Sequence, residues 1–141
     1  MAKYPTTSIE DVPPEPVAEE EGWHKMDIRF LATKDNLGSN NATMFRTVFP
    51  PGGAHKKHHH TKADEIYYII RGRAAGGAGD EEHELRPGSL HFIPKGVTHW
   101  TRNLSPTEEL ELVGIYTEVG SLEDSGYVYD GEWTEEDRKI T

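Results

Sequence analysis

Hydrophobic and polar positions alternate along short stretches of this chain, and residues such as Gly, Pro and Asn separate the stretches. In the first stretch, residues 24–32, Met26, Ile28 and Phe30 alternate with mostly polar side chains, the period of a strand with one buried face. Further strands are expected at 43–49, 65–71, 73–79, 89–93, 97–102 and 109–118. Many short strands without a long helical period predict an all-β sandwich or barrel.

Neither end of the chain follows this pattern. Residues 1–22 combine four prolines with several acidic residues, so they bury too little surface to offset their chain entropy and should form an extended arm. That arm is either a peripheral tail or a segment that docks on a neighbouring subunit. The barrel is expected over residues 23–119 and a C-terminal extension over residues 120–141. In the extension, Thr134 precedes three acidic residues, which suits the first turn of a short helix.

Composition limits the class of partner. A chain of 141 residues suits one domain, and its formal net charge of −10 argues against nucleic-acid binding, which needs clustered Lys and Arg. No apolar run approaches the roughly 20 residues of a membrane span, and no signal-peptide core follows the first Met. The absence of cysteine excludes disulfides and thiolate ligands. We therefore expect a soluble cytoplasmic protein that binds neither nucleic acid nor membranes.

Three histidines and a glutamate have spacings that would bring them together. His58 and His60 are two residues apart, so on a strand both point to one face while His59 points to the other. Glu65 opens the next expected strand, and His99 follows a Pro/Gly turn that brings a second hairpin across the barrel. Three imidazoles and one carboxylate suit divalent iron, manganese, nickel or zinc. We expect one such ion per chain.

These residues also complete two motifs that resemble those of the cupin family. The first, G-x5-H-x-H-x4-E-x6-G, runs from Gly52 to Gly72, and the second, G-x5-P-x-G-x2-H-x3-N, from Gly88 to Asn103. The resemblance implies a jelly-roll barrel of two antiparallel sheets, with the metal on the three histidines and the glutamate. Cupins include dioxygenases, isomerases, lyases, decarboxylases and non-catalytic binders, so the resemblance does not select a reaction.

Four protein ligands on a six-coordinate ion leave two positions open. They suit a bidentate substrate, or a substrate oxygen together with dioxygen, and the positive ion attracts enolates and carboxylates. The first hypothesis is therefore a metal-dependent enzyme acting on a small oxygenated organic molecule, as a non-haem iron dioxygenase. The alternatives are a redox-neutral lyase, isomerase or cyclase, and a non-catalytic cupin that binds a small molecule.

The redox-neutral alternative needs a proton-transfer group, for which Tyr67 is the candidate. Tyr67 shares the expected strand face of Glu65 and should point inward, whereas Tyr68 should point outward. In cupin lyases that cleave dimethylsulfoniopropionate, the tyrosine after the glutamate has this role; here the spacing from His60 to Glu65 is one residue longer. The competing interpretation is that Tyr67 only lines the pocket. Arg46 would anchor a substrate carboxylate if it faced inward, but the alternation around it does not decide its side.

The remaining histidines and Trp100 are not expected to take part in the metal site. His55 is interpreted as a loop histidine rather than a neighbour of the ligands, and His24, His83 and His91 as ordinary residues. Trp100 should face away from the metal and fill either the core or a subunit interface. A homodimer is expected, because single-domain cupins often pair sheet against sheet and exposed strand edges would otherwise stay unpaired.

Overall fold

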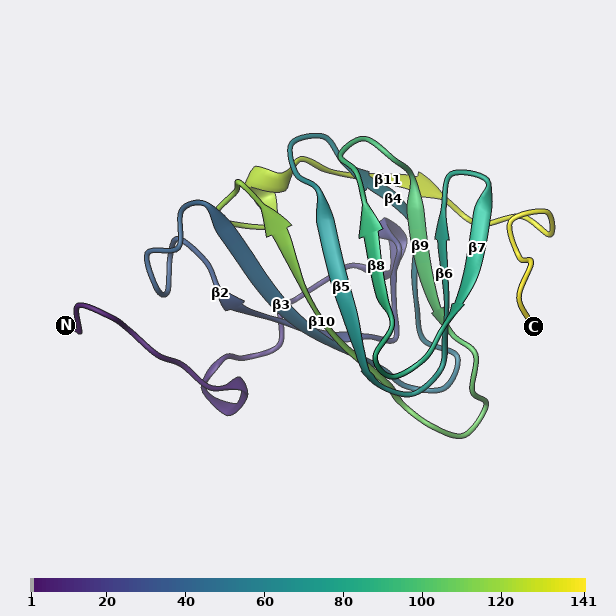
Figure 1. The fold of residues 1–141 in the computed structure, drawn as a ribbon, viewed down its shortest axis with the longest axis horizontal. Helices are drawn as coiled ribbons and strands as arrows, with labels where there is room; N and C mark the ends of the chain where they lie inside the picture. Colours follow the sequence, from purple (N-terminus) through teal and green to yellow (C-terminus); the bar gives the residue numbers. More distant parts are fainter. Residues whose placement is uncertain (1) are drawn as a thin grey trace.

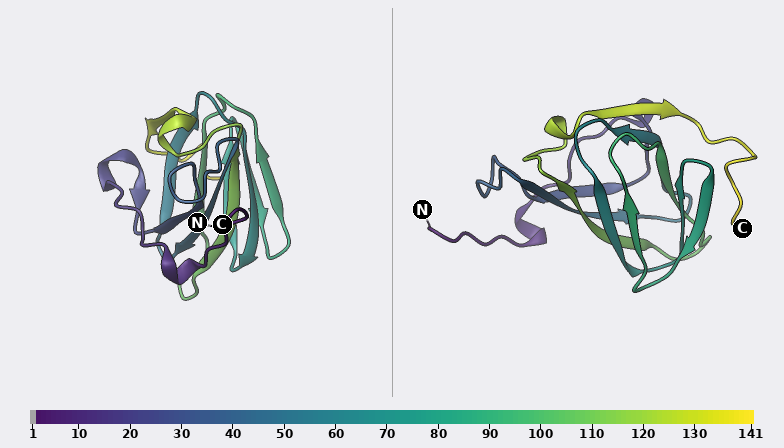
Figure 2. Two further views of the ribbon diagram at one scale, coloured as in Figure 1. Left: turned by 90° about the vertical axis from the view of Figure 1, so that its left-hand side faces the viewer. Right: turned by 45° about the horizontal axis from the view of Figure 1, so that its top comes forward.

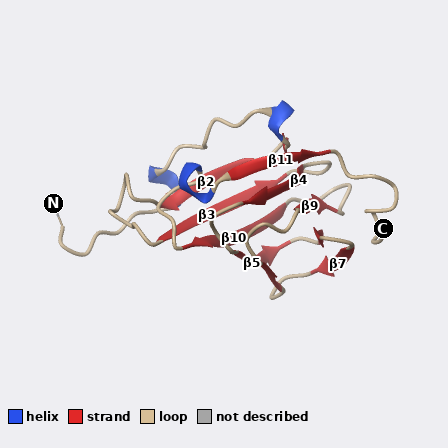
Figure 3. Cartoon of the chain, turned by 90° about the horizontal axis from the view of Figure 1, so that it is seen from above, coloured by secondary structure: helices blue, strands red, loops and turns tan. Residues whose placement is uncertain are grey.

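The computed structural model describes residues 2–141, in which eleven strands form two antiparallel sheets (Figure 1). The strands are β1 Trp23–His24, β2 Asp27–Ala32, β3 Ala42–Phe49, β4 Ala54–His60, β5 Glu65–Arg71, β6 Ala74–Ala78, β7 Glu81–Leu85, β8 Leu90–Ile93, β9 His99–Asn103, β10 Leu110–Thr117 and β11 Tyr127–Gly131. Within these residues, helix is limited to three short 3-10 turns, Ile9–Asp11, Glu19–Glu21 and Glu123–Ser125 (Figure 3). None of the helices in this range is long and apolar enough to cross a membrane. The expected all-β jelly roll is confirmed.

The two sheets form the layers of a flattened barrel (Figure 2). One has the order β1-β4-β9-β6-β7, with β11 also paired to β4, and the other has the order β2-β3-β10-β5-β8. β1 pairs with the beginning of β4 and β11 with its end, while β9 lies on the opposite side of β4. The strand that carries His58 and His60 is therefore bordered by segments from both ends of the chain.

Most of the strands lie where the hydrophobic alternation predicts them. β4 was expected only from the spacing of its histidines, and β7 and β11 lie outside the expected ranges. No strand was expected between the ranges 73–79 and 89–93, whereas Glu81–Leu85 pairs along its whole length with β6. β11 comes from residues 127–131, within the segment expected to be a C-terminal extension, and its side chains alternate between half-buried and exposed. Both strands lie near the edges of their sheet and bury few apolar side chains, so a pattern based on hydrophobic alternation misses them.

The short helix near the C-terminus lies earlier than the sequence suggests, at Glu123–Ser125. Thr134–Asp137 forms a single turn, in which the Asp137 amide donates to the Thr134 carbonyl at 3.1 Å. The Asp137 carboxylate accepts from the Thr134 amide at 2.7 Å and from the Lys57 ammonium at 3.1 Å. These reciprocal contacts are those of a helix N-terminus, but the chain continues past this turn without forming a helix.

Aromatic and aliphatic side chains fill the space between the sheets. On β3, Phe45 and Phe49 point into this core. Arg46 alternates with them and faces outward, where its guanidinium donates to Glu111 at 2.7 Å. The structure thus decides the question that the alternation left open: Arg46 cannot anchor a substrate inside the barrel.

Trp100 faces away from the barrel interior, as expected, and is covered by the chain itself. Its indole N–H donates to the Glu82 carboxylate at 2.8 Å. The same carboxylate pairs with Arg102 and accepts the backbone N–H groups of Lys139 and Ile140 from the C-terminal segment. Of the two interpretations of Trp100, packing within the chain is therefore correct, and it is buried to 1% exposure without a subunit interface.

Candidate metal centre

Strands β4, β5 and β9 bring four side chains to one point inside the barrel. His58, His60, Glu65 and His99 each offer one ligand atom, and these atoms all lie within 4.8 Å of one another. His58 and His99 are direct partners in the β4–β9 register, and Glu65 reaches the site from the facing sheet. All four side chains are buried. The structure thus places together the four residues that the spacing selected.

Main-chain carbonyls orient two of the imidazoles. His58 donates from Nδ1 to the Lys56 carbonyl at 2.6 Å, and His99 donates from Nδ1 to the Val97 carbonyl at 2.9 Å. A carbonyl oxygen only accepts, so the neutral ring carries its proton on Nδ1 and keeps a lone pair on Nε2. This tautomer, fixed by a backbone acceptor, is the arrangement typical of a metal-ligating histidine.

His60 also carries its proton on Nδ1, because a serine hydroxyl accepts a hydrogen bond from that nitrogen. The Ser125 hydroxyl donates to the Leu122 carbonyl at 2.5 Å, so its oxygen accepts from His60 Nδ1 at 2.9 Å. His60 Nε2 is buried and has no hydrogen-bond partner among residues 2–141. Leaving a buried nitrogen unpaired costs about 1–3 kcal/mol, and buried polar groups normally have partners. The unpaired nitrogen therefore indicates a ligand atom.

Lone pairs converge on the Glu65 carboxylate. Its Oε1 lies 3.1 Å from His60 Nε2 and 3.0 Å from His99 Nε2. Since these nitrogens carry no proton in the assigned tautomers, the contacts repel unless a cation lies between the atoms. Three imidazole nitrogens and one carboxylate suit divalent iron, manganese, nickel or zinc. The residues present fit a divalent metal.

The protonation states agree with this fit. Burial lowers the pKa of His58 well below its ordinary value, so its imidazole is neutral. Burial alone would raise the pKa of Glu65, but positive charge or a donated proton at His99 and His60 would outweigh burial and lower it. With neutral rings, a divalent ion between these atoms would keep the carboxyl ionised in the same way. Metal ligands have to be deprotonated in this way, with histidine neutral and glutamate ionised.

Tyr67 is buried on the face of β5 that carries Glu65, and Tyr68 is exposed, as the strand period predicts. The Tyr67 oxygen lies 3.0 Å from His91 Nδ1 and accepts from the Thr101 hydroxyl at 3.3 Å. Burial raises the pKa of the Tyr67 phenol above its ordinary value, so the phenol is protonated at neutral pH. Burial also lowers the pKa of His91 to about 4, so this ring is uncharged there.

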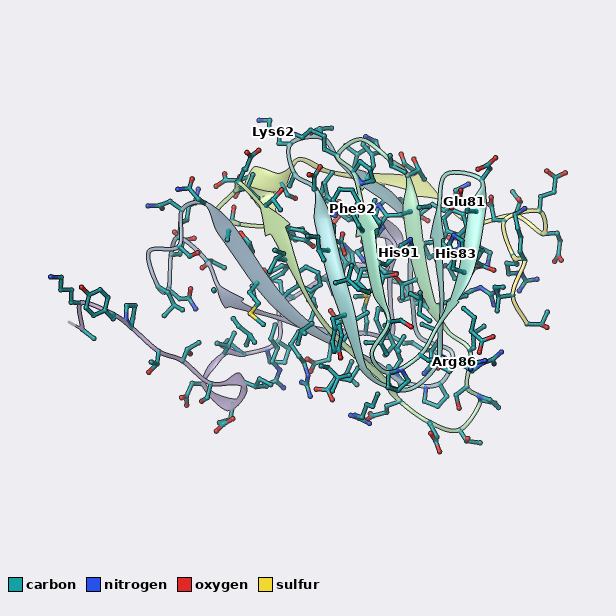
Figure 4. The ribbon with its side chains drawn as sticks, in the orientation of Figure 1. Lys62, Glu81, His83, Arg86, His91 and Phe92 are labelled. Carbon is teal, nitrogen blue, oxygen red and sulfur yellow. The ribbon has the colours of Figure 1, made fainter. Side chains whose placement is uncertain are left out.

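His91 is a residue that the sequence interpretation missed. It lies on β8 beside His83 of β7, with ring centroids 6.2 Å apart, at the edges of the two sheets (Figure 4). Leu90 and Phe92, on either side of it, are exposed. That alternation was available in the sequence and indicates that His91 points inward, but its contact with Tyr67 depends on the β5–β8 register.

The loop interpretation of His55 was wrong. His55 lies on β4, is buried, and stacks against the ring of His58 with centroids 3.6 Å apart. Residues three apart on a regular strand face opposite sides. In β4 the register with β9 shifts between these two positions, and the irregularity lets both rings face inward. His59 faces outward and pairs with Asp130 at 2.8 Å.

Comparison with known proteins agrees with this architecture. A family model described as a cupin domain matches residues 45–116, which is about half of the chain. The chain belongs to the cupin family. The cupin is 25% identical over 115 residues to germin-like protein subfamily 1 member 4 of Arabidopsis thaliana, covering 76% of the chain and 48% of the relative. It spans about half the length of the curated relatives it matches, 50% and 48%.

Two solved structures illustrate the shared fold. A cupin-like protein from Thermotoga maritima superposes with a TM-score of 0.72 at 25% identity, covering 93% of this cupin and 94% of that chain. An oxalate oxidase in complex with glycolate superposes with a TM-score of 0.65 at 23% identity, covering 75% of this cupin and 55% of that chain. At 23% identity, the likeness to the oxalate oxidase concerns the fold alone.

Proposed function

We propose that this cupin is a metal-dependent enzyme that acts on a small oxygenated organic molecule. The observation that carries the proposal is the gathering of three imidazoles and the Glu65 carboxylate, with one ligand atom from each within 4.8 Å of the others. Two of the Nε2 atoms contact the carboxylate, and His60 Nε2 has no hydrogen-bond partner among the described residues. A bound divalent ion would supply Lewis-acid stabilisation of a substrate oxygen that develops negative charge. The buried barrel walls around the ligands exclude water and strengthen that electrostatic interaction.

The leading reaction class is that of a non-haem iron dioxygenase. His58, His60, Glu65 and His99 would hold the iron, and the ion would supply the activation of dioxygen beside the substrate. The proposed substrate is small and oxygen-rich, like the glycolate in the oxalate oxidase that shares this fold. In this reaction Tyr67 lines the pocket, and its hydroxyl is held by His91 and Thr101.

A redox-neutral lyase, isomerase or cyclase is the second candidate, and the position of Tyr67 favours it. Its phenol is buried inside the barrel on the same face of β5 as Glu65. A protonated phenol beside the substrate is a general acid, and its neutral imidazole partner His91 can accept or return a proton. His91 therefore gives Tyr67 a route for proton exchange that the dioxygenase does not require.

We also propose that two copies of the cupin pair through the outer face of the β2-β3-β10-β5-β8 sheet. Five large apolar side chains are exposed on this face: Met44, Tyr68, Ile70, Leu90 and Phe92. Clustered exposed apolar residues are typical of interaction sites rather than of free surface. A second copy would present the same side chains in return, as a two-fold interface requires.

Metal analysis of protein purified without a nickel column tests the proposed function. We expect one divalent ion per chain, and iron with oxygen-dependent turnover supports the dioxygenase over the redox-neutral enzyme. Single changes of His58, His60 and His99 to Ala, and of Glu65 to Gln, should each lower metal occupancy strongly. His59→Ala is the matched control, because this imidazole faces outward. Occupancy that is lost in His59→Ala but kept in His58→Ala would overturn the proposed site.

A further inference from the structure

Aromatic side chains from both ends of the chain pack around His58: Tyr127 contacts its ring directly, and Trp23 reaches it through His55. His55 stacks on His58 at a centroid distance of 3.6 Å and an interplanar angle of 16°. Trp23 of β1 stacks on the other side of His55 at 4.0 Å, and Tyr127 of β11 lies 5.1 Å from His58 and 5.0 Å from Trp23. We call Trp23, His55 and Tyr127 the His58 clamp.

We propose that the His58 clamp consists of positioning residues that hold the His58 ring in its ligating orientation and thereby set the affinity for the metal. This inference rests on the proposed metal centre and adds to it a second layer of residues, none of which is a ligand. His55 lies flat against His58 and is not part of the group of four whose ligand atoms converge.

Strand pairing fixes where the clamp residues lie. Trp23 is the register partner of His55 in the β1–β4 pair. β11 lies on the same side of β4 as β1 does (Figure 1). In the β11–β4 register, Tyr127 is the partner of His60 and Tyr129 is the partner of His58. The clamp therefore forms only when both chain ends have paired with β4, which couples their docking to the geometry of the metal centre.

Hydrogen bonds hold the ring of His55, which lies between Trp23 and His58. Tyr127 donates its hydroxyl proton to the Glu21 carbonyl at 2.6 Å. Since that proton is used, the 3.0 Å contact between Tyr127 and His55 Nε2 has the imidazole as donor. His55 is thus fixed by a hydrogen bond at its edge and by stacking on both of its faces.

The clamp removes the remaining freedom of His58. The hydrogen bond from His58 Nδ1 to Lys56 fixes one edge of the ring, but a single bond lets the ring tilt about it. The flat contact with His55 opposes that tilt and keeps Nε2 directed at Glu65 and His99. Loss of residues that orient a ligand typically lowers metal affinity about 10–100-fold.

Manganese affinity, measured by competition with a chelator, tests the proposal without a substrate. His55→Leu replaces the ring with an apolar side chain and should lower the affinity about 10-fold or more. His55→Phe keeps a flat ring and should retain an affinity within about threefold of the native protein, which is the rescue expected of stacking. His83→Ala is the matched histidine control, because His83 is exposed on β7 and lies outside the clamp.

Three results would distinguish the possible failures. A native protein that binds no manganese, zinc or iron contradicts the proposed function itself. A native protein that binds metal, with His55→Leu equally tight, overturns the clamp alone. The absorption spectrum of the cobalt-loaded protein should change in His55→Leu and not in His55→Phe, a signature that general destabilisation would not produce. If His55→Leu does not fold, Trp23→Leu makes the same test from the other side of His55, with the same expected loss and the same overturning result.

Discussion

The hydroxyl of Tyr67 has two partners inside the barrel, and their chemistry limits what it can do. Thr101 donates to it, and His91 Nδ1 lies at hydrogen-bond distance. If His91 carries its proton on Nε2, it accepts from Tyr67; if on Nδ1, it donates and leaves the phenol proton for another acceptor. Gly76 makes room for this pair, since a Cβ there would lie 2.7 Å from the Tyr67 oxygen and 2.9 Å from His91 Nδ1.

Tyr67→Phe separates the two candidate reactions. In a redox-neutral enzyme the change removes the proton-transfer group, so kcat should fall about 10²–10⁴-fold while metal content stays at one ion per chain. In a dioxygenase whose Tyr67 only lines the pocket, kcat should change little, and removal of oxygen should stop turnover. Steady-state kinetics with and without oxygen, together with metal analysis, check this. A large loss of bound metal in Tyr67→Phe would contradict both interpretations of Tyr67.

At the scale of elements, one buried carboxylate joins β7 to the C-terminal segment. The Glu82 side chain is 0% exposed and pairs with Arg102 at 2.8 Å. It also accepts the Lys139 and Ile140 amides at 2.7 and 2.9 Å. Burial would raise the pKa of Glu82, but the hydrogen bonds from Arg102, Trp100 and the two amides outweigh burial and lower it to about 2.

This lowered pKa predicts an acid-sensitive attachment of the C-terminal segment. The pKa of an unfolded-state glutamate is about 4.3, so the ionised Glu82 contributes about 3 kcal/mol above that pH. The contribution should disappear as the pH falls from about 5 to about 2. Glu82→Gln should remove a similar amount at pH 7 and speed hydrogen exchange at the Lys139 and Ile140 amides. Urea unfolding and amide exchange measure both effects.

Glu81→Gln is the control for this prediction, because Glu81 lies on the same strand with an exposed side chain. It should leave both the free energy of unfolding and the exchange rates nearly unchanged. Native-like protection of the Ile140 amide in Glu82→Gln would show that the carboxylate does not hold the segment.

At the scale of the whole molecule, the outer face of the β2-β3-β10-β5-β8 sheet exposes large apolar side chains. Leu90 and Phe92 are 59% and 51% exposed, and Tyr68 lies on the neighbouring strand. A stable interface needs roughly 800 Å² from each partner. The proposed dimer would bury this face and leave the sheet that carries His58, His60 and His99 outside the interface.

Light scattering at micromolar concentration should return twice the chain mass of 15.9 kDa. The double change Leu90→Lys with Phe92→Glu puts charges in the centre of the proposed interface and should give the monomer mass without unfolding the barrel. Val128→Lys is the control, since Val128 is 40% exposed on β11 of the other sheet and should not alter the mass. A monomeric native protein would refute the dimer.

Much of this cupin could be predicted from local sequence, because the period of a strand is a local property. The two-residue period places His58 and His60 on one face and Tyr67 on the face of Glu65, and the structure has both arrangements. Gly and Pro mark the turns for the same reason, since backbone conformation at a turn depends on the residue itself. The fold class and the cluster of four side chains followed from these two kinds of signal.

Tertiary structure decided the features that depend on a partner strand. The irregularity in β4 that turns His55 inward comes from its pairing with β9, and the contact of His91 with Tyr67 from the β5–β8 register. Likewise, only the barrel shows that Arg46 faces outward and that the C-terminal segment covers Trp100. No local pattern carries this information, because the side that a residue faces and the residues it meets are set by strands distant in sequence. The side chains that surround the candidate metal centre are therefore set by the tertiary structure and not by local sequence.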